Sequence, residues 1–302
     1  MRTSATRAEH QTVGGDRGIG FRVARLIGLT LCGSALCVMG CDTPRPTGAP
    51  GRPPPQRLSD YFRGPTPEEA AALALDEFSA DNRAIGVSLL SAEDFGGAGA
   101  YIDLYVDSAR DEDAAVREAG IRALGRHGET THAEILVEAL SDENDSVRVA
   151  AARGLQRIHS NTAVAPLIRA TDPDTETLSE VRAFAAGALG QYRQRRVLQA
   201  LIAALDDREL AVNHNARKSL NTLTGQDFGL ELGAWLDWLE ESENAFAGAR
   251  VYEYPAYNRP LKFYEVLPFW PKPLNETPAP PVGYPRDLTP VVEPDSVEAG
   301  EG

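Results

Sequence analysis

"AVREAGIRAL", residues 115–124, is the stretch that decides the fold, because three later stretches align with it without gaps. They are "SVRVAAARGL" at 146–155, "EVRAFAAGAL" at 180–189 and "AVNHNARKSL" at 211–220. Each copy has a valine at its second position and a leucine eight residues later: Val116 and Leu124, Val147 and Leu155, Val181 and Leu189, Val212 and Leu220. Internal similarity at a fixed period is the signature of a repeat architecture.

The positions three and four residues after each valine are mostly small: Ala119 and Gly120, Ala150 and Ala151, Ala185, Ala216. On a helix these offsets share one face, and small side chains there allow a neighbouring helix to approach closely. Upstream of each copy lies another apolar stretch: "YIDLYV", "EILVEAL", "APLIRA" and "LQALIAAL". Each unit is therefore expected to be a helix pair whose second helix faces inward. An earlier, weaker pair, "EEAAALALDEF" and "NRAIGVSLL", brings the expected number of pairs to about five.

The repeated Val-Arg dipeptides carry a resemblance to a known family. Val116-Arg117, Val147-Arg148 and Val181-Arg182 recur with valine spacings of 31, 34 and 31 residues, which resembles HEAT repeats of the short bacterial kind over residues 67–224. The resemblance implies an α-solenoid in which these arginines form a polar ladder. Asn213 stands where the fourth arginine belongs, so the ladder is expected to end there.

The segment after the last repeat, "LTGQDFGLELGAWLDWLEE", is similar to terminal segments of planctomycete-type HEAT proteins. Trp235 and Trp238 lie three residues apart, on one face of a helix. The exposed end of a solenoid must be covered, so we expect these two rings to cap the last repeat. The predicted fold class is all-α: an α-solenoid of short HEAT-like helix pairs, with an extended proline- and aromatic-rich C-terminal arm.

The N-terminal region has the features of an export signal. Five arginines precede an apolar run from Leu26 to Gly40, and its fifteen residues fall short of the roughly 20 that span a bilayer. Val38-Met39-Gly40-Cys41 resembles the bacterial lipobox, which implies that Cys41 is the lipidated first residue of the mature chain. An ordinary cleaved signal and an uncleaved anchor are the alternatives. We therefore expect a signal peptide at 1–40 and a proline-rich tether at 41–66.

Cleavage before Cys41 would remove the other two cysteines, Cys32 and Cys37. The mature chain could then form no intrachain disulfide, zinc cluster or thiol nucleophile. The removed stretch has a net charge of +3, so the whole-chain charge of −14 becomes about −17. An acidic surface repels phosphate backbones, and no nucleic-acid partner is expected.

Residues 67–245 hold few prolines and are predicted to form the solenoid with its capping helix, and 246–302 to form the arm and an acidic tail. Seven aromatic residues lie between Tyr252 and Trp270. Either this segment folds back on the solenoid, with Arg259 and Lys262 facing its acidic groups, or it docks on a partner. We expect the first, because exposed aromatic surface is a liability on a soluble protein. Beyond Pro273 the composition predicts disorder.

Residues suited to catalysis are scarce. The histidines outside the signal, His127, His132, His159 and His214, are expected at the surface or in turns, and the repeated His-Glu dipeptides of HEAT-like di-iron hydroxylases do not occur. Acids in "ARDEDAAVR" and "SDENDSVR" are interpreted as helix caps rather than calcium ligands, and "GGAG" at 96–99 as a linker. No catalytic, cofactor-binding or metal-binding residue is predicted.

These features together predict a non-enzymatic scaffold. It would be exported, lipid-anchored to a bacterial membrane, and mediate protein-protein interaction in the cell envelope, with another protein bound on the solenoid surface. The alternatives are a HEAT-like enzyme or accessory subunit, phycobilin-lyase-like or metal-dependent, and a purely structural spacer.

Overall fold

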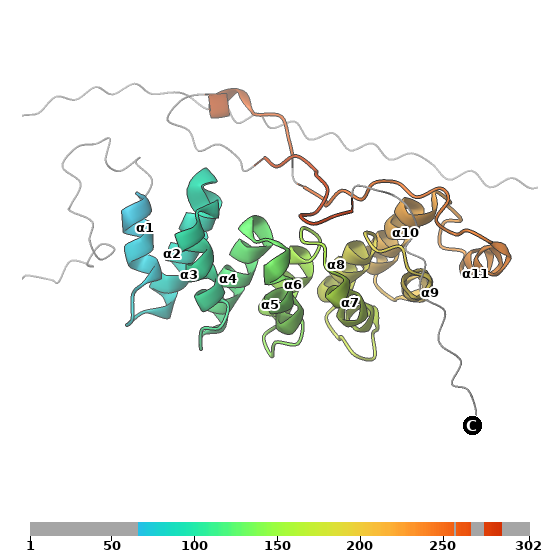
Figure 1. Cartoon of the computed structure of the whole chain (residues 1–302), viewed down its shortest axis with the longest axis horizontal. Coiled ribbons are helices and arrows are strands. Elements are labelled where there is room, and N and C mark those ends of the chain that lie inside the picture. The colour runs from blue at the N-terminus through green and yellow to red at the C-terminus, as the bar shows by residue number, and fades with distance from the viewer. Residues whose placement is uncertain (1–65, 257, 267–274, 286–302) are drawn as a thin grey trace, which may run out of the picture. The chain divides into compact units, whose positions relative to one another are not determined.

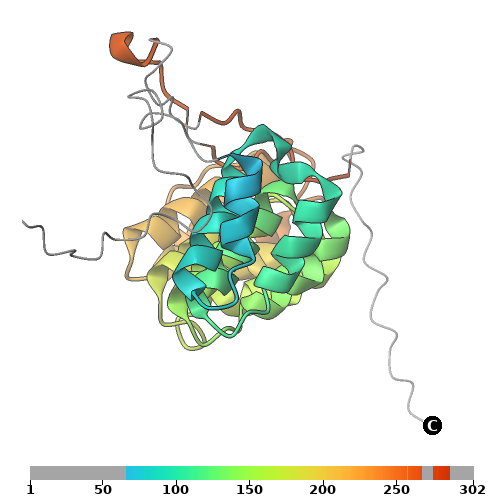
Figure 2. The same ribbon diagram turned by 90° about the vertical axis from the view of Figure 1, so that its left-hand side faces the viewer.

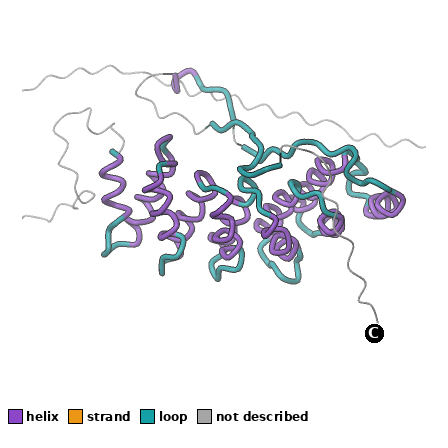
Figure 3. Tube along the Cα trace, viewed as in Figure 1, coloured by secondary structure: helices purple, strands orange, loops and turns teal. Residues whose placement is uncertain are grey.

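The computed structural model describes residues 66–256, 258–266 and 275–285, and over these ranges the chain is helical (Figures 1 and 3). Five helix pairs and one single helix follow one another: α1 Pro67–Ala74 and α2 Ala80–Ala92, α3 Gly99–Ser108 and α4 Ala114–His127, α5 Ala133–Ala139 and α6 Asp145–Gly154, α7 Val164–Thr171 and α8 Ser179–Leu189, α9 Arg195–Ala203 and α10 Leu210–Thr224, then α11 Leu232–Glu241. Short 3-10 turns lie at Asp94–Gly97, Thr130–His132, Asn161–Ala163, Ala204–Asp206 and Phe263–Val266. Within these ranges no helix is both long and apolar enough to cross a membrane.

The second helices form one continuous layer. α2 packs on α4, α4 on α6, α6 on α8, and α8 on α10, so each pair contacts the next mainly through its second helix. Seen from the α1 end, the pairs lie one behind another (Figure 2). The described helices therefore form an α-solenoid, as the repeated sequence predicts.

The repeat positions lie in the interior of this stack. The four aligned valines and four aligned leucines, Val116, Leu124, Val147, Leu155, Val181, Leu189, Val212 and Leu220, are at most 1% exposed. The small residues between them are buried as well. Packing between second helices is tight enough that a Cβ added at Gly125 would stand 2.6 Å from the Cα atom of Gly154. The α4 and α6 backbones thus touch where no side chain intervenes.

A ladder of arginine-carboxylate pairs joins successive repeats. Its four rungs are Arg83 with Asp111, Arg117 with Asp142, Arg148 with Glu176, and Arg182 with Asp207. In each rung Nε and Nη2 donate to the two carboxylate oxygens at 2.7–3.1 Å. Bidentate charge-assisted pairs of this kind are among the strongest side-chain hydrogen bonds. The ladder starts at Arg83, one repeat earlier than the Val-Arg pattern indicates.

Each ladder guanidinium also donates a hydrogen bond to the turn that precedes its own helix. The Nη1 atoms of Arg117, Arg148 and Arg182 donate to the carbonyl oxygen six residues earlier, at 3.0–3.1 Å. Asn213 makes the equivalent bond, with Nδ2 donating to the Asp207 carbonyl oxygen at 3.0 Å. An amide is too short to reach a further repeat, so the ladder ends at α10.

The acids before the second helices divide between two roles. Asp113 caps α4 by accepting from the backbone N–H groups of Ala115 and Val116, as expected. In "SDENDSVR", however, the cap of α6 is Asn144, whereas the carboxylate of Asp142 belongs to the ladder. Hydrogen bonds from Arg182 hold the pKa of Asp207 below its ordinary value, although partial burial opposes this shift. Asp207 is therefore an ionised part of the framework.

α11 lies at the end of the stack. The Trp235 side chain is fully buried, its Nε1 donates to the Gly229 carbonyl oxygen at 3.2 Å, and Phe228 meets its ring edge-on at 4.9 Å. Trp238 is partly buried and lies 6.0 Å from Trp235 between ring centroids. Arg195 of α9 donates to the Leu239 carbonyl oxygen at 2.9 Å, which connects α11 to the last pair.

The register of the repeats can be tested at Val147. Because this side chain is 1% exposed, Val147→Asp places an unpaired charge in the stack and should lower the free energy of unfolding by about 3 kcal/mol or more. Leu210→Asp is the matched control: Leu210 is 74% exposed at the start of α10, and its loss should change stability by about 0.5 kcal/mol or less. Urea denaturation measures both. Equal midpoints for the two variants would contradict the register.

The ladder can be tested at its most buried rung. The side chains of Arg182 and Asp207 are 7% and 2% exposed, so Arg182→Ala leaves a buried carboxylate without its counter-ion and should cost about 3–5 kcal/mol in urea denaturation. Arg217 pairs with Asp227 at the surface, where both side chains are 43% exposed, and Arg217→Ala should shift the urea midpoint much less. A loss for Arg182→Ala no larger than that for Arg217→Ala would show that the ladder contributes little.

Candidate functional site

After α11 the chain turns back over the second helices as an arm, defined here as the described residues from 246 onward (Figure 1). The Arg250 N–H donates to the Thr222 carbonyl oxygen at 2.8 Å. Tyr252 is buried at 6% exposure, and its ring lies so close to Gly190 that an added Cβ there would be 3.2 Å from it. The Tyr254 ring faces the Arg157 guanidinium at 4.6 Å. The first part of the arm therefore lies on the ends of α10, α8 and α6.

Residues 275–285, the return segment, pair with the loop that follows α6. The Val282 N–H donates to the Arg157 carbonyl oxygen at 2.8 Å, and the His159 N–H donates to the Val282 carbonyl oxygen at 2.9 Å, which forms an isolated parallel bridge. Gly283 has a φ of 79° and lies against Thr130, where an added Cβ would be 2.2 Å from the Thr130 methyl carbon. The stack thus holds an extended peptide by its backbone.

Disorder was expected beyond Pro273, and residues 275–285 correct this expectation because they contact the stack, whereas residues 286–302 lie outside the described residues. Within the segment from Tyr252 to Trp270, which was expected to dock, Tyr252 and Tyr254 contact the stack. Phe263 is 87% exposed, and its ring meets that of Tyr264 at 5.5 Å between ring centroids. Arg259 pairs with Glu265 inside the arm, at 2.5 Å. Tyr257 and residues 267–270 lie outside the described residues. The rings of the arm that contact the stack include those of Phe246, Tyr252, Tyr254 and Tyr284.

An aromatic cluster lies under the return segment. The His159 ring stacks on Tyr192 at 4.8 Å, and Tyr284 meets it edge-on at 5.6 Å. His159 Nδ1 lies 3.1 Å from Gln191 Oε1, and burial lowers the pKa of His159 below its ordinary value. Arg193 donates to the Tyr284 hydroxyl at 3.2 Å. The neutral imidazole of His159 therefore lies between Tyr192 of the next repeat and Tyr284 of the arm and contacts both rings.

The other histidines have local structural contacts. His127 Nε2 lies 2.8 Å from the Ser91 carbonyl oxygen and so connects two repeats, as His159 does. Both are half-buried: His159 lies in the loop after α6, whereas His127 ends α4 and is neither at the surface nor in a turn, where it was expected. His132 Nδ1 accepts from the Glu129 N–H at 2.9 Å in a turn, and His214 is exposed. In the described ranges, no three His, Cys, Asp or Glu side chains converge to hold a metal ion. Cys41 lies outside those ranges.

Two arginines from α4 and two from the end of α6 line a cavity of about 280 Å³ between these helices, which we call the arginine groove. Arg122 and Arg126 are four residues apart on α4, and Arg153 and Arg157 repeat this spacing at α6. Residues four apart share one face of a helix, so the four guanidiniums face one opening. Gly125 and Gly154, the point of backbone contact between the helices, also line it.

Glu276 of the return segment enters the arginine groove. Its carboxylate forms a short ion pair with Arg157 and lies 3.9 Å from Arg126. Burial alone would raise the pKa of Glu276, but the hydrogen bond and charge of Arg157 outweigh it, and the pKa is lowered. The carboxylate is therefore ionised near neutral pH and adds a charge-assisted contact to the backbone bridge at Val282.

These four arginines were not predicted from the sequence. They stand six and ten residues after the repeat valine in two consecutive repeats, in "VREAGIRALGR" and "VRVAAARGLQR". The equivalent residues of the next repeat are Gly187 and Gln191. The repeat alignment rests on inward-facing positions. The cluster is visible only when outward-facing positions are compared between repeats.

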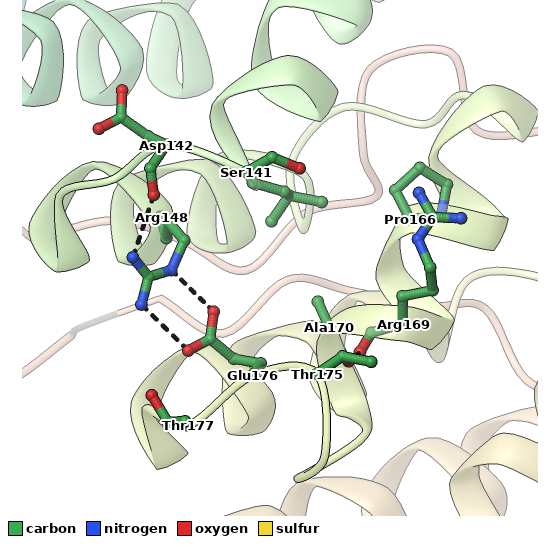
Figure 4. A pocket seen from close by; sticks show the side chains of 10 residues that line it. Ser141, Asp142, Arg148, Pro166, Arg169, Ala170, Thr175, Glu176 and Thr177 are labelled. Atoms are coloured by element: carbon green, nitrogen blue, oxygen red, sulfur yellow. Dashed lines mark hydrogen bonds and ion pairs between the residues drawn. The ribbon is translucent and has the colours of Figure 1, made fainter.

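A second cavity, of about 350 Å³, lies beside the ladder between the third and fourth helix pairs (Figure 4). The figure shows the Arg148 guanidinium bound to Glu176 and to the backbone of Asp142, with Thr175 and Arg169 on the other side of the opening. Because Glu176 and two backbone carbonyls already bind Arg148, this arginine acts as part of the framework.

Comparison with known families agrees with this architecture. A model described as HEAT repeats matches residues 102–179, and one described as PBS lyase HEAT-like repeat matches residues 181–207. The chain carries a HEAT-repeat domain. The matched residues run from α3 through the 3-10 turn after α9, so they include every element of the arginine groove except the arm. A comparison with curated proteins gave no match.

The HEAT-repeat domain is similar to several solved helical-repeat structures. An engineered protein shares 20% identity over 51% of this chain and 77% of its own, with a TM-score of 0.42. The complex of CpcE and CpcF of phycocyanin lyase from Nostoc sp. PCC7120 shares 21% over 59% and 82%, with a TM-score of 0.35. A designed armadillo repeat protein in complex with the peptide (KR)4 shares 15% over 58% and 87%, with a TM-score of 0.40. Identity at this level is no evidence for a shared function.

Docking of the return segment can be tested at Gly283. Gly283→Ala places a Cβ against Thr130 and requires alanine to adopt a positive φ. This left-handed backbone conformation costs a non-glycine residue about 1–2 kcal/mol. Hydrogen exchange of the Val282 N–H should accelerate about five- to thirtyfold, because this bond opens when the segment leaves. An unprotected Val282 N–H in the unmodified chain would instead show that the segment is free.

Gly233→Ala is the matched control for this experiment. A Cβ added at Gly233 meets nothing within 4 Å, and the residue lies in α11, away from the return segment. Its exchange profile at Val282 and within α6 should equal that of the unmodified chain. Exchange within α6 should also be unchanged in Gly283→Ala, since the helix has its own core.

Proposed function

We propose that this chain is a protein-binding scaffold, exported and held at a bacterial membrane by a lipid on Cys41. The HEAT-repeat domain would present the binding surface, and the proline-rich stretch at 41–66 would set its distance from the membrane. A lipid anchor confines the search for a partner to the membrane plane. The proposal treats the chain as non-enzymatic.

The observation that carries the binding function is the return segment. An extended stretch of polypeptide lies on the ends of the second helices, fixed by two backbone hydrogen bonds at Val282 and by the Glu276-Arg157 ion pair. Backbone pairing of this type is a general mode of peptide recognition, since the hydrogen bonds give affinity and side-chain pockets give specificity. A surface that binds one extended peptide in cis supports the binding of another in trans.

The anchor rests on the lipobox-like Val38-Met39-Gly40-Cys41. Cys41→Ser should abolish incorporation of labelled fatty acid and leave a precursor of higher mass, because serine lacks the sulfur that receives the lipid. Ser34→Ala, inside the predicted signal, should leave labelling unchanged. Labelling that persists in Cys41→Ser would refute the lipidation site.

The scaffold function is tested by crosslinking in the native host. A photo-crosslinking residue at exposed His214 on α10 should capture a specific protein, identified by mass spectrometry. The same capture should fail for a probe at exposed Glu134 on α5, which belongs to the layer of first helices. Recovery of no specific protein would favour the structural spacer instead.

The enzyme alternative has its own measurement. The PBS lyase HEAT-like description of residues 181–207 motivates it, and a HEAT-like enzyme or accessory subunit would carry a metal or a chromophore. Metal analysis and an absorption spectrum of the protein purified from its host should detect neither if the chain is a scaffold. A stoichiometric metal or chromophore would overturn the non-enzymatic assignment.

A further inference from the structure

The arginine groove contrasts with the rest of the chain in charge. The protein has a net charge of −14, yet four guanidiniums line one cavity between α4 and α6. The carboxylates in its lining are Glu118 and Glu276, so the lining has a net charge of +2, and +3 when the arm leaves. Such a local charge on an acidic protein attracts anionic groups to this opening.

The arginines are only partly used. Arg122 is 51% exposed and pairs with Glu118 one turn earlier on the same helix, a surface pair of little strength. Its Nη2 also donates to Ser88 Oγ at 3.1 Å, a neutral acceptor that leaves its charge available. Arg153 is exposed, and its described contact is with the Phe184 ring, at 5.3 Å; no described carboxylate lies within ion-pair distance of it. Glu276 reaches Arg157 and Arg126 at one side of the cavity. The side lined by Arg122 and Arg153 is open to a further carboxylate.

The return segment indicates what kind of molecule fits. It approaches the groove as an extended chain, with one carboxylate in the groove and its backbone bridged to the α6 loop six residues later, at Val282. A peptide following the same path meets the same carbonyl of Arg157 and N–H of His159. Carboxylates along such a peptide would match guanidiniums that stand one helical turn apart. The whole-chain charge disfavours nucleic acid and anionic lipid surfaces, both of which would face the acidic flanks.

We propose that the arginine groove binds an extended, carboxylate-rich segment of a partner protein, and that Glu276 occupies part of this site in cis. Arg126 and Arg157 exchange the Glu276 carboxylate for one from the partner, and Arg122 and Arg153 take a second. Partner binding therefore displaces the return segment and breaks the bridge at Val282. The inference rests on the scaffold function and adds the site, the ligand chemistry and a competitor within the chain.

The test uses the full chain in detergent and a fluorescein-labelled peptide of alternating glutamate and proline, twelve residues long, followed by fluorescence anisotropy. Because arm and peptide compete, Gly283→Ala should raise the affinity by up to the factor by which it weakens the arm, about five- to thirtyfold. In that background Arg153→Ala should lower the affinity about tenfold, since a charge-assisted pair is lost. Arg110→Ala removes an equal charge at an exposed turn outside the groove and is the matched control.

Four outcomes would overturn the inference. They are equal binding of a glutamine-proline peptide, equal losses for Arg153→Ala and Arg110→Ala, no gain in Gly283→Ala, and binding of the Gly283→Ala chain to phosphatidylserine vesicles or inorganic phosphate but not to the peptide. Melting curves of both arginine variants check that the fold is kept. A second readout is independent of affinity: added peptide should accelerate exchange of the Val282 N–H in the unmodified chain, and unchanged exchange at saturating peptide would refute the displacement.

Failure of this inference is distinguishable from failure of the scaffold function. A crosslinked partner that maps away from α4 and α6, combined with no peptide binding, would refute the groove and leave the scaffold. Peptide binding at the groove without any partner in the host would retain the site and refute the scaffold.

Discussion

The contact between second helices at their small residues is the constraint on which the rest of the structure depends. Where Gly125 meets Gly154, the backbones themselves touch, and no larger residue can be accommodated without moving a helix. This close approach buries the repeat valines and leucines and sets the spacing of successive turns. The ladder arginines can bridge those turns only at that spacing, because a bidentate pair tolerates little variation in distance. Gly125 and Gly154, at the point of closest approach, line the cavity between α4 and α6, and the arginines on both helices complete its lining.

Much of the fold could be predicted because inward-facing positions are chemically restricted. A buried position between two close helices accepts only small or apolar residues, so Gly120, Ala151, Ala185 and Ala216 recur in register and reveal the period. Asn213 was informative for the same reason, since the departure from arginine marks the end of the ladder. Asp142 was expected to cap α6, but it pairs with Arg117 of the preceding repeat. An acid before a helix can either cap that helix or pair with a neighbouring repeat, and the sequence does not distinguish these two roles.

The arm and the groove were harder to predict because their positions are set by long-range contacts. Composition favoured Tyr252 to Trp270 as the docked part, yet Phe263 is exposed and Val282, in a stretch expected to be disordered, forms the backbone bridge. Proline-rich composition argues against helix and strand, but it does not argue against an extended segment lying on a preformed surface. The arginines of the groove occupy outward-facing positions, where any polar residue is tolerated. Their possible role as carboxylate ligands is indicated only by the contact of Glu276 with Arg126 and Arg157.

The return segment also changes how the stack is expected to fold. A repeat array with contacts only between neighbours behaves as a one-dimensional chain, in which each unit can open almost independently. The Glu276-Arg157 pair closes a loop of 119 residues across this array. Such a tie makes opening of one repeat depend on the others and raises the contact order of an otherwise local topology. We expect this tie to form late in folding, because closing so long a loop costs entropy that is offset only once the helices it joins have packed. Cooperativity in this solenoid would then come from an arm outside the repeats, and a partner that displaced the arm would loosen the coupling between them.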